Sequence, residues 1–174
     1  MILIISSSLN SESNSRILAR ETQRVLESHG HAVTLLDLRD HPLPLCDGGP
    51  SYGHPNVARV GELLRAASTF IIATPIYNYD VTAAIKNLIE LTGGAWENKL
   101  VGFLCAAAGQ SSYMSVMSLA NSLMLDFRSL IIPRFVYATS DAFGDDRITD
   151  PKLSARVADL AHAAARLDRQ LQAA

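Results

Sequence analysis

Short apolar runs alternate with longer amphipathic stretches along the whole chain. Most of the apolar runs are continuous blocks, without the polar residue at every second position that a half-exposed strand would show. Continuous blocks of this kind are typical of parallel strands that are covered on both faces. The pattern predicts five strands, at Ile2–Ser6, Ala32–Asp37, Thr69–Thr74, Leu100–Ala107 and Leu130–Tyr137.

The amphipathic stretches between these runs predict five helices. Gly30 and the pair Gly93-Gly94 are expected to end the first and third helices, and Asp150-Pro151 is expected to begin the last. The predicted helices run from about Ser15 to His29, Asn56 to Ala67, Thr82 to Leu91, Ser112 to Ser129, and Asp150 to Leu171.

This alternation predicts one α/β domain over residues 1–174, built on a doubly wound, five-stranded parallel sheet. The common strand order for such a sheet is 2-1-3-4-5, as in flavodoxin-like folds. Ligands of these folds bind at the carboxyl ends of the strands, beside the point where the strand order reverses. Three loops, at 7–15, 75–81 and 108–112, are therefore expected to form the functional edge.

Composition and charge exclude several classes of function. With 48% hydrophobic and 18% charged residues the chain is expected to be globular, and its net charge of −2 gives no sign of a nucleic-acid or membrane-surface partner. No apolar run approaches the roughly 20 residues of a membrane span, and the opening MILII is too short for a signal peptide. Cys46 and Cys105 fit neither a disulfide framework nor a metal knuckle. We therefore expect a cytoplasmic protein.

The first loop is rich in hydrogen-bonding groups. Residues 7–15, SSLNSESNS, contain five serines and two asparagines and lead into Arg16 at the start of a helix. Hydroxyls, amides and free backbone N–H groups at a helix N-terminus can form a phosphate site. The alternative is an ordinary N-cap with a polar turn. The sequence contains neither a G-x-G-x-x-G nor a G-x-x-x-x-G-K-[ST] motif, which argues against a dinucleotide fingerprint and against NTP hydrolysis.

The other two loops suit a flat ligand. In the second, Pro75 fixes the strand exit, Tyr77 and Tyr79 offer aromatic faces, and Asn78 can pair with the edge of a heterocycle. The alternative is buried tyrosines beside an asparagine turn. The third loop, at 106–112, is AAAGQSS, whose small residues and single glycine permit a close backbone approach, although its serines could equally be a helix cap. Together the loops outline a flavin mononucleotide (FMN) site.

At this point the chain resembles the NAD(P)H-dependent FMN reductases of flavodoxin-like fold. That family carries a central motif close to T-P-x-Y-N-x₇-K-N-x-x-[DE] and a polar loop after its first strand. The positions that match the motif here are Thr74, Pro75, Tyr77, Asn78, Lys86, Asn87 and Glu90. The resemblance extends from Met1 to about Ala142.

The resemblance implies a set of cofactor-binding residues. Those expected to bind the phosphate are Ser8, Asn10, Ser13, Asn14, Ser15 and Arg16. Those expected to line the flavin ring are Pro75, Ile76, Tyr77 and Asn78, and those expected to close over its other edge are Ala108, Gly109, Gln110 and Ser111. Asn10 stands where the family usually has arginine, so that either Arg16 compensates for the missing charge or FMN binds more loosely.

The implied reaction is hydride transfer from NAD(P)H, with NADPH favoured, to FMN and onward to free flavin, a quinone, an azo dye or a metal oxyanion. The cofactor carries this chemistry, so we expect no catalytic side chain and no metal. None of the histidines is spaced like a metal ligand set or a catalytic triad; they are His29, His31, His41, His54 and His162. The family also implies a homodimer or homotetramer. The alternatives are a flavodoxin-like electron carrier and an FMN-binding module without turnover.

Overall fold

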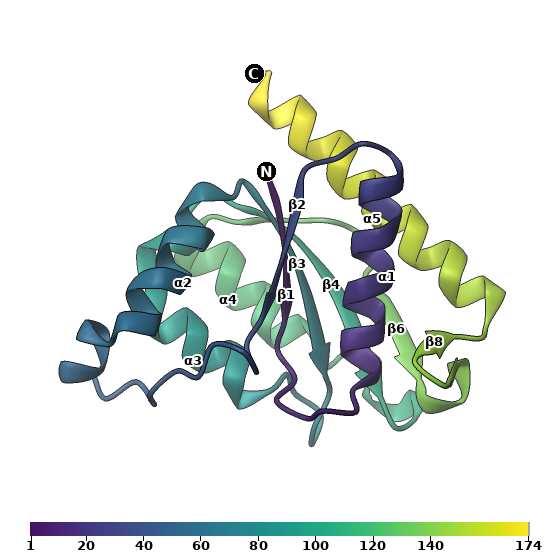
Figure 1. The fold of residues 1–174 in the computed structure, drawn as a ribbon, viewed down its shortest axis with the longest axis horizontal. Helices are drawn as coiled ribbons and strands as arrows, with labels where there is room; N and C mark the ends of the chain where they lie inside the picture. The colour runs from purple at the N-terminus through teal and green to yellow at the C-terminus, as the bar shows by residue number, and fades with distance from the viewer. Residues whose placement is uncertain (174) are drawn as a thin grey trace.

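A computed structural model, which describes residues 1–173, contains the predicted alternation of strands and helices (Figure 1). The main strands are β1 (Ile2–Ser6), β2 (Val33–Asp37), β3 (Thr69–Pro75), β4 (Leu100–Ala107), β5 (Leu130–Ile131) and β6 (Val136–Thr139), with a short antiparallel pair β7 (Phe143–Gly144) and β8 (Arg147–Ile148). The α-helices are α1 (Asn14–Ser28), α2 (Pro55–Ala66), α3 (Ala83–Thr92), α4 (Met117–Phe127) and α5 (Pro151–Gln172).

The order of the parallel sheet is β2-β1-β3-β4-β5, which confirms the predicted order. Ser6 at the end of β1 lies in register with Asp37 at the end of β2 and with Ala73 near the end of β3. The carboxyl ends of these strands therefore meet at one edge, from which the loops after β1 and β3 emerge.

The fifth strand position differs from the prediction of one strand over 130–137. It is occupied in turn by β5 and β6, both of which pair with β4, so that the sheet contains six strands. Pro133 lies between them and has no N–H to offer a neighbouring strand, and Arg134 adopts a left-handed backbone with φ of 63°. These two residues explain the interruption.

The fourth helix is also shorter than predicted. It begins at Met117, whereas the sequence pattern placed its start at Ser112. Residues Gln110–Ser112 form a short 3₁₀ helix instead, and turns connect it to α4. The serines and glycine in this stretch offer the backbone local hydrogen bonds outside a helix, which the apolar periodicity alone does not reveal.

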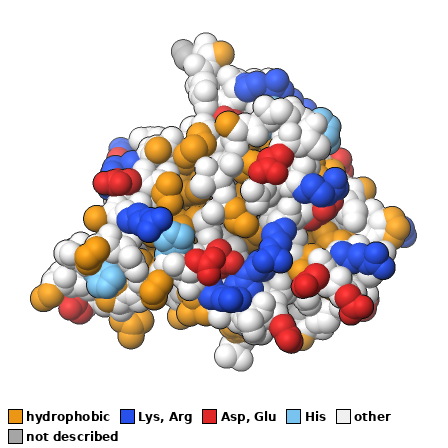
Figure 2. All heavy atoms as spheres, in the orientation of Figure 1, with side chains coloured by type: hydrophobic (Ala, Val, Ile, Leu, Met, Phe, Trp, Pro, Cys, Tyr) orange, Lys and Arg blue, Asp and Glu red, His pale blue; other side chains and the backbone are white. Residues whose placement is uncertain are grey.

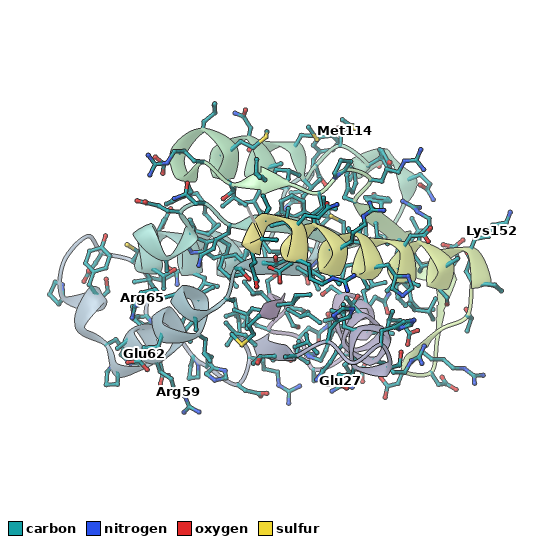
Figure 3. All side chains as sticks on the ribbon, turned by 90° about the horizontal axis from the view of Figure 1, so that it is seen from above. Glu27, Arg59, Glu62, Arg65, Met114 and Lys152 are labelled. Carbon is teal, nitrogen blue, oxygen red and sulfur yellow. The ribbon has the colours of Figure 1, made fainter. Side chains whose placement is uncertain are left out.

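Two apolar layers cover the sheet, as a doubly wound fold requires. Helices α2, α3 and α4 pack on one face, where Phe70, Phe103 and Trp96 are fully buried. Helices α1 and α5 pack on the other face, over Ile4 and Leu104. Figure 1 shows α1 and α5 lying together on one side of the strands. In Figure 3 the charged side chains labelled on α2 and at the start of α5 point away from these layers.

The predicted helix ends are present. Gly30 follows α1 with a φ of 75°, and Gly93 follows α3 with a φ of 36°, both in the region that favours glycine. The Asp150 side chain accepts a hydrogen bond from the N–H of Lys152 and thereby caps α5. Among the described residues, no helix combines the length and the apolarity that crossing a bilayer requires.

Candidate functional site

The three predicted loops come together at the carboxyl edge of the sheet. The N–H of Ile76 donates to the carbonyl of Ala106 at 2.8 Å, which joins the second loop to the third. The Thr82 hydroxyl, which caps α3, donates to the Ser7 hydroxyl at 3.1 Å and joins the second loop to the first. The loops are thus held against each other by direct hydrogen bonds.

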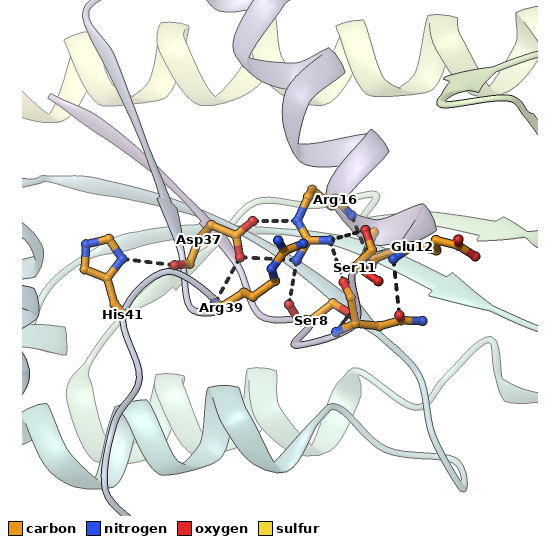
Figure 4. A network of polar contacts seen from close by, with 10 residues as sticks. Ser8, Ser11, Glu12, Arg16, Asp37, Arg39 and His41 are labelled. Atoms are coloured by element: carbon orange, nitrogen blue, oxygen red, sulfur yellow. Dashed lines mark hydrogen bonds and ion pairs between the residues drawn. The ribbon is translucent and has the colours of Figure 1, made fainter.

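Arg16 organises the first loop from the inside (Figure 4). Its side chain is 5% exposed, and its Nε lies 2.5 Å from Asp37 Oδ2 at the end of β2. Its terminal nitrogens donate to the carbonyls of Ser8 at 2.9 Å, Asn10 at 2.6 Å and Ser11 at 3.1 Å. The guanidinium therefore holds the loop folded around itself.

This arrangement corrects the prediction that Arg16 supplies a hydrogen bond and a compensating charge to a phosphate. All three guanidinium nitrogens donate within the protein, and both terminal nitrogens donate twice. No N–H of this group is left for a ligand, and its charge is matched by Asp37. The sequence placed Arg16 in the right loop but gave it the wrong partner.

The inward carbonyls of the first loop turn its N–H groups outward. A trans peptide is planar, so its N–H points opposite to its C=O. With the carbonyls of Ser8 and Asn10 aimed at the guanidinium, the N–H groups of Leu9 and Ser11 point away from it. The first N–H groups of α1, at Asn14 and Ser15, also lack intrahelical acceptors. This loop presents backbone donors beside a helix N-terminus.

The side chains predicted to bind phosphate take part in the loop's own hydrogen bonds. Ser8 is buried, and its hydroxyl accepts from the N–H of Asn10 at 3.3 Å. The amide oxygen of Asn10 accepts from the N–H of Glu12 at 3.2 Å. The Ser13 hydroxyl caps α1 and lies 2.9 Å from the Ser15 hydroxyl. These side chains shape the loop, whereas Asn14, half-exposed, is in the first turn of the helix.

The second loop is a tight turn that displays two tyrosines. The backbone N–H and C=O groups of Tyr77 and Asp80 bond to each other at 2.9 and 3.0 Å, and the two residues between them, Asn78 and Tyr79, have φ values of 52° and 65°. Asparagine adopts this conformation readily, but tyrosine does so at a cost of about 1 kcal/mol. Both tyrosines are 55% exposed, so neither is a core residue.

The third loop is open and is supported from below. The Tyr137 hydroxyl donates to the carbonyl of Gly109, and burial raises the pKa of Tyr137, which keeps the hydroxyl protonated as a donor. A Cβ placed on Gly109 would meet no atom within 4 Å. The side-chain Nε2 of Gln110 donates to the Thr139 hydroxyl at 3.4 Å. The predicted residues of this loop are all exposed: Ala108, Gly109, Gln110 and Ser111.

Sequence reasoning missed the structural roles of three residues near these loops: Asp37, Thr82 and Asn87, the last of which belongs to the central motif. Asp37 and Thr82 bind the first loop, as described above. Asn87 of the central motif donates to the carbonyl of Pro44 at 2.9 Å and accepts from the N–H of Cys46 at 2.8 Å. A buried arginine in the first turn of a helix is the signal that could have pointed to an acid at a strand end.

The two cysteines lie in different environments, and neither belongs to a metal site within residues 1–173. Burial raises the pKa of the Cys105 thiol to about 12, so that it remains protonated at neutral pH. The thiol of Cys46, which is half-buried, lies 3.6 Å from the Tyr52 hydroxyl. Within residues 1–173, no three His, Cys, Asp or Glu side chains are grouped so that they could hold a metal ion.

We predict that replacing Arg16 with glutamine destabilises the protein by about 3–5 kcal/mol, because Asp37 would be left as a buried charge without its partner. Urea unfolding followed by circular dichroism measures this loss. Arg24→Gln on the same helix is the matched control, because Arg24 also pairs with an acid, Glu21, but its side chain is 67% exposed. Its unfolding midpoint should match that of the wild type, and equal midpoints for both variants would contradict the role given to Arg16.

Comparison with known proteins shows to which family this chain belongs. Residues 1–144 match the family described as NADPH-dependent FMN reductase. The chain is 32% identical over 132 residues to an NAD(P)H-dependent FAD/FMN reductase of Geobacillus thermodenitrificans, and the match covers 74% of this chain and 71% of the relative. It is 31% identical over 109 residues to an FMN-dependent NADH:quinone oxidoreductase of Shewanella loihica, 55% of each chain.

Solved structures share the fold at lower sequence identity. The flavoenzyme NAD(P)H:(acceptor) oxidoreductase FerB of Paracoccus denitrificans has a TM-score of 0.79 and 18% identity, with 97% of both chains covered. An archaeal flavodoxin has a TM-score of 0.68 and 10% identity, with 97% of this chain and 99% of the other covered. These likenesses establish the flavodoxin-like fold alone. The family match over most of its length shows that the chain belongs to the NADPH-dependent FMN reductases.

Proposed function

We propose that residues 1–174 act as one NAD(P)H-dependent flavin oxidoreductase domain, which transfers hydride from NAD(P)H to FMN and electrons onward to a small-molecule acceptor. The observation that carries this proposal is the first loop, whose carbonyls face the Arg16 guanidinium and whose N–H groups face outward. A phosphate is the ligand that such a set of backbone donors at a helix N-terminus suits.

The described residues fit both the phosphate and the ring of FMN. Donors at Leu9, Ser11 and the start of α1 would hold the phosphate. Pro75, Ile76, Tyr77 and Asn78 would line one side of the ring, because the tight turn keeps Tyr77 exposed. The open space over Gly109 would accept the other edge of the ring, together with Ala108, Gln110 and Ser111.

FMN, when bound, supplies the redox chemistry. The task of this chain is then to bind and to orient. The Tyr77–Asp80 turn fixes the height of the aromatic platform above the sheet edge, and the Ile76–Ala106 hydrogen bond fixes its distance from the third loop. Tyr137 holds the Gly109 carbonyl away from the ring position, which leaves the backbone there free to approach a flat ligand.

Free flavin and a quinone are the proposed acceptors that the names of two relatives support, one an FAD/FMN reductase and the other an NADH:quinone oxidoreductase. Azo dyes and metal oxyanions are further acceptors that an open flavin edge would suit. NADPH is the proposed donor, with NADH as the alternative.

The cytoplasmic setting and the homodimer or homotetramer expected from the sequence belong to the same proposal. Exposed apolar side chains on α4, among them Met117, Met124 and Leu125, support an association of copies.

The activity test uses the purified chain. FMN is titrated in and followed by flavin fluorescence, and NADPH or NADH is then added anaerobically while the oxidised-flavin absorbance is recorded. We expect saturable binding and rapid bleaching, followed by recovery of the absorbance when a quinone is added. Binding without bleaching by either nucleotide would identify an electron carrier or an FMN-binding module. An absence of FMN binding would contradict the proposal that FMN is the cofactor.

A second prediction concerns Gly109. Replacing it with valine should weaken FMN binding by about tenfold or more, because the added side chain would occupy the space above the loop that the ring needs. Stability should change little, since the Cβ of the new side chain meets no protein atom within 4 Å.

Gly53→Val is the matched control for this variant. A Cβ on Gly53 also meets nothing within 4 Å, and Gly53 lies in the 3₁₀ helix Pro50–Gly53, outside the three loops. FMN fluorescence titrations of both variants, with urea unfolding alongside, complete the test. Equal FMN affinity in the Gly109 variant and the wild type would place the ring elsewhere.

A further inference from the structure

A separate cavity lies beside the three loops, on the β2 side of the sheet edge. Its volume is about 430 Å³, within the range of about 300–1,000 Å³ that small-molecule sites occupy. Most of its lining is apolar and comes from three segments: Leu9, then Leu38, Pro42, Leu43 and Leu45, then Ala83 and Ala84. Figure 2 shows hydrophobic side chains gathering over the segment between β2 and α2. The remaining lining residues are Arg39, His41 and Asn87.

The outer wall of the cavity is fixed in place. Asn87 on α3 holds this wall at two points, by donating to the carbonyl of Pro44 and by accepting from the N–H of Cys46. The side-chain amide of Asn87 therefore fastens this wall through both its nitrogen and its oxygen. Leu43 and Leu45, which flank Pro44, line the cavity together with Ala83 and Ala84 at the start of α3.

The cavity is distinct from the flavin loops. None of the fourteen residues predicted to contact FMN is among its lining residues. Leu9 is the point of contact between the two places: its side chain lines the cavity, while its backbone belongs to the first loop. A ligand in this cavity would therefore lie next to bound FMN without occupying its position.

The mouth of the cavity carries a positive charge without a partner. The Arg39 side chain is exposed, and no ion pair within residues 1–173 includes it. Its neighbour Asp37 is already paired with Arg16, and the only group of Arg39 from which Asp37 accepts a hydrogen bond is the backbone N–H, at 3.1 Å from Oδ1. His41 is anchored by a 3.0 Å contact between its Nδ1 and the Asp37 carbonyl (Figure 4). Arg39 is thus available to pair with an anion at an apolar opening.

We propose that this cavity binds a small anion with a flat, apolar body, of the class of aromatic carboxylates. The leucines, proline and alanines would bury the ring system, and the Arg39 guanidinium would pair with the carboxylate at the mouth. This site is independent of the proposed flavin chemistry, because its charge and, apart from the side chain of Leu9, its lining belong to other residues.

The test measures binding of 2-naphthoate to the full chain by isothermal titration calorimetry, with and without saturating FMN. We expect one site per chain and an affinity that FMN leaves within about threefold. The uncharged analogue 2-naphthamide should bind at least about tenfold more weakly, because it cannot form the charged pair.

Two variants locate the site. Ala83→Trp fills the cavity from an exposed position of α3 and should abolish naphthoate binding; Ala58→Trp, on an exposed position of α2 outside the lining, is its control. Arg39→Gln should reduce naphthoate affinity to that of the amide, whereas Arg59→Gln, which changes an outward-pointing arginine of α2 (Figure 3), should not.

Three outcomes would overturn the proposal. The first is no measurable binding of naphthoate. The second is binding that FMN displaces and that the Ala83 variant leaves intact, which would place naphthoate in the flavin loops. The third is that the wild type does not bind naphthoate and sediments as a dimer, whereas the Ala83→Trp variant sediments as a monomer. That result would identify a second copy of the chain as the occupant of the cavity.

Discussion

The edge of the sheet depends on the pair formed by Arg16 and Asp37. Burying a guanidinium costs several kcal/mol unless its charge and its N–H groups find partners. Here the charge is met by Asp37, and the remaining N–H groups are met by three carbonyls of one loop. The pair joins the end of β2, the loop after β1 and the first turn of α1, which are separate segments of the chain. Its geometry decides which way the loop's peptide groups face.

This arrangement also sets the character of the phosphate position. A cradle of backbone N–H groups and a helix N-terminus carries only partial positive charge, whereas a free arginine would add a full one. Asn10 brings no charge to this loop, and Arg16 is neutralised by Asp37. Both facts favour FMN that exchanges with solution over FMN that is held permanently.

A second constraint lies in the turn after β3. Tyr79 adopts a backbone conformation that disfavours bulky side chains, and it is held there by the two hydrogen bonds between Tyr77 and Asp80. Below the turn, the N–H of Thr82 lies 3.4 Å from the Thr74 hydroxyl, and the Thr82 hydroxyl donates to Ser7. Buried, hydrogen-bonded groups thus support an exposed and strained aromatic surface, as expected where a turn must meet a ligand.

The sequence predicted the architecture because that architecture rests on local signals. Continuous apolar blocks and capping residues such as Gly30 and Asp150 are visible in one dimension, and they led to the correct strand order. Pro133 also signalled a break in the last strand, but the apolar residues on both sides of it led to the prediction of one continuous strand. The partners of Arg16 and Asn87 could not be found in this way. Their partners lie 21, 41 and 43 positions away in the chain, or are loop carbonyls whose direction only the folded backbone defines.

Asp37 also decides how the two ligand positions relate to each other. Both carboxylate oxygens accept from Arg16 and hence hold the first loop, Oδ1 also accepts the backbone N–H of Arg39, and the carbonyl contacts His41 at the cavity mouth. Both positions are therefore built on the same residue at the end of the edge strand β2. Conformational coupling between two ligands requires an element between them with two arrangements that they populate differently. A strand end fixed by the sheet on one side and by a buried ion pair on the other offers a single arrangement, so that proximity here implies independent binding and not coupling.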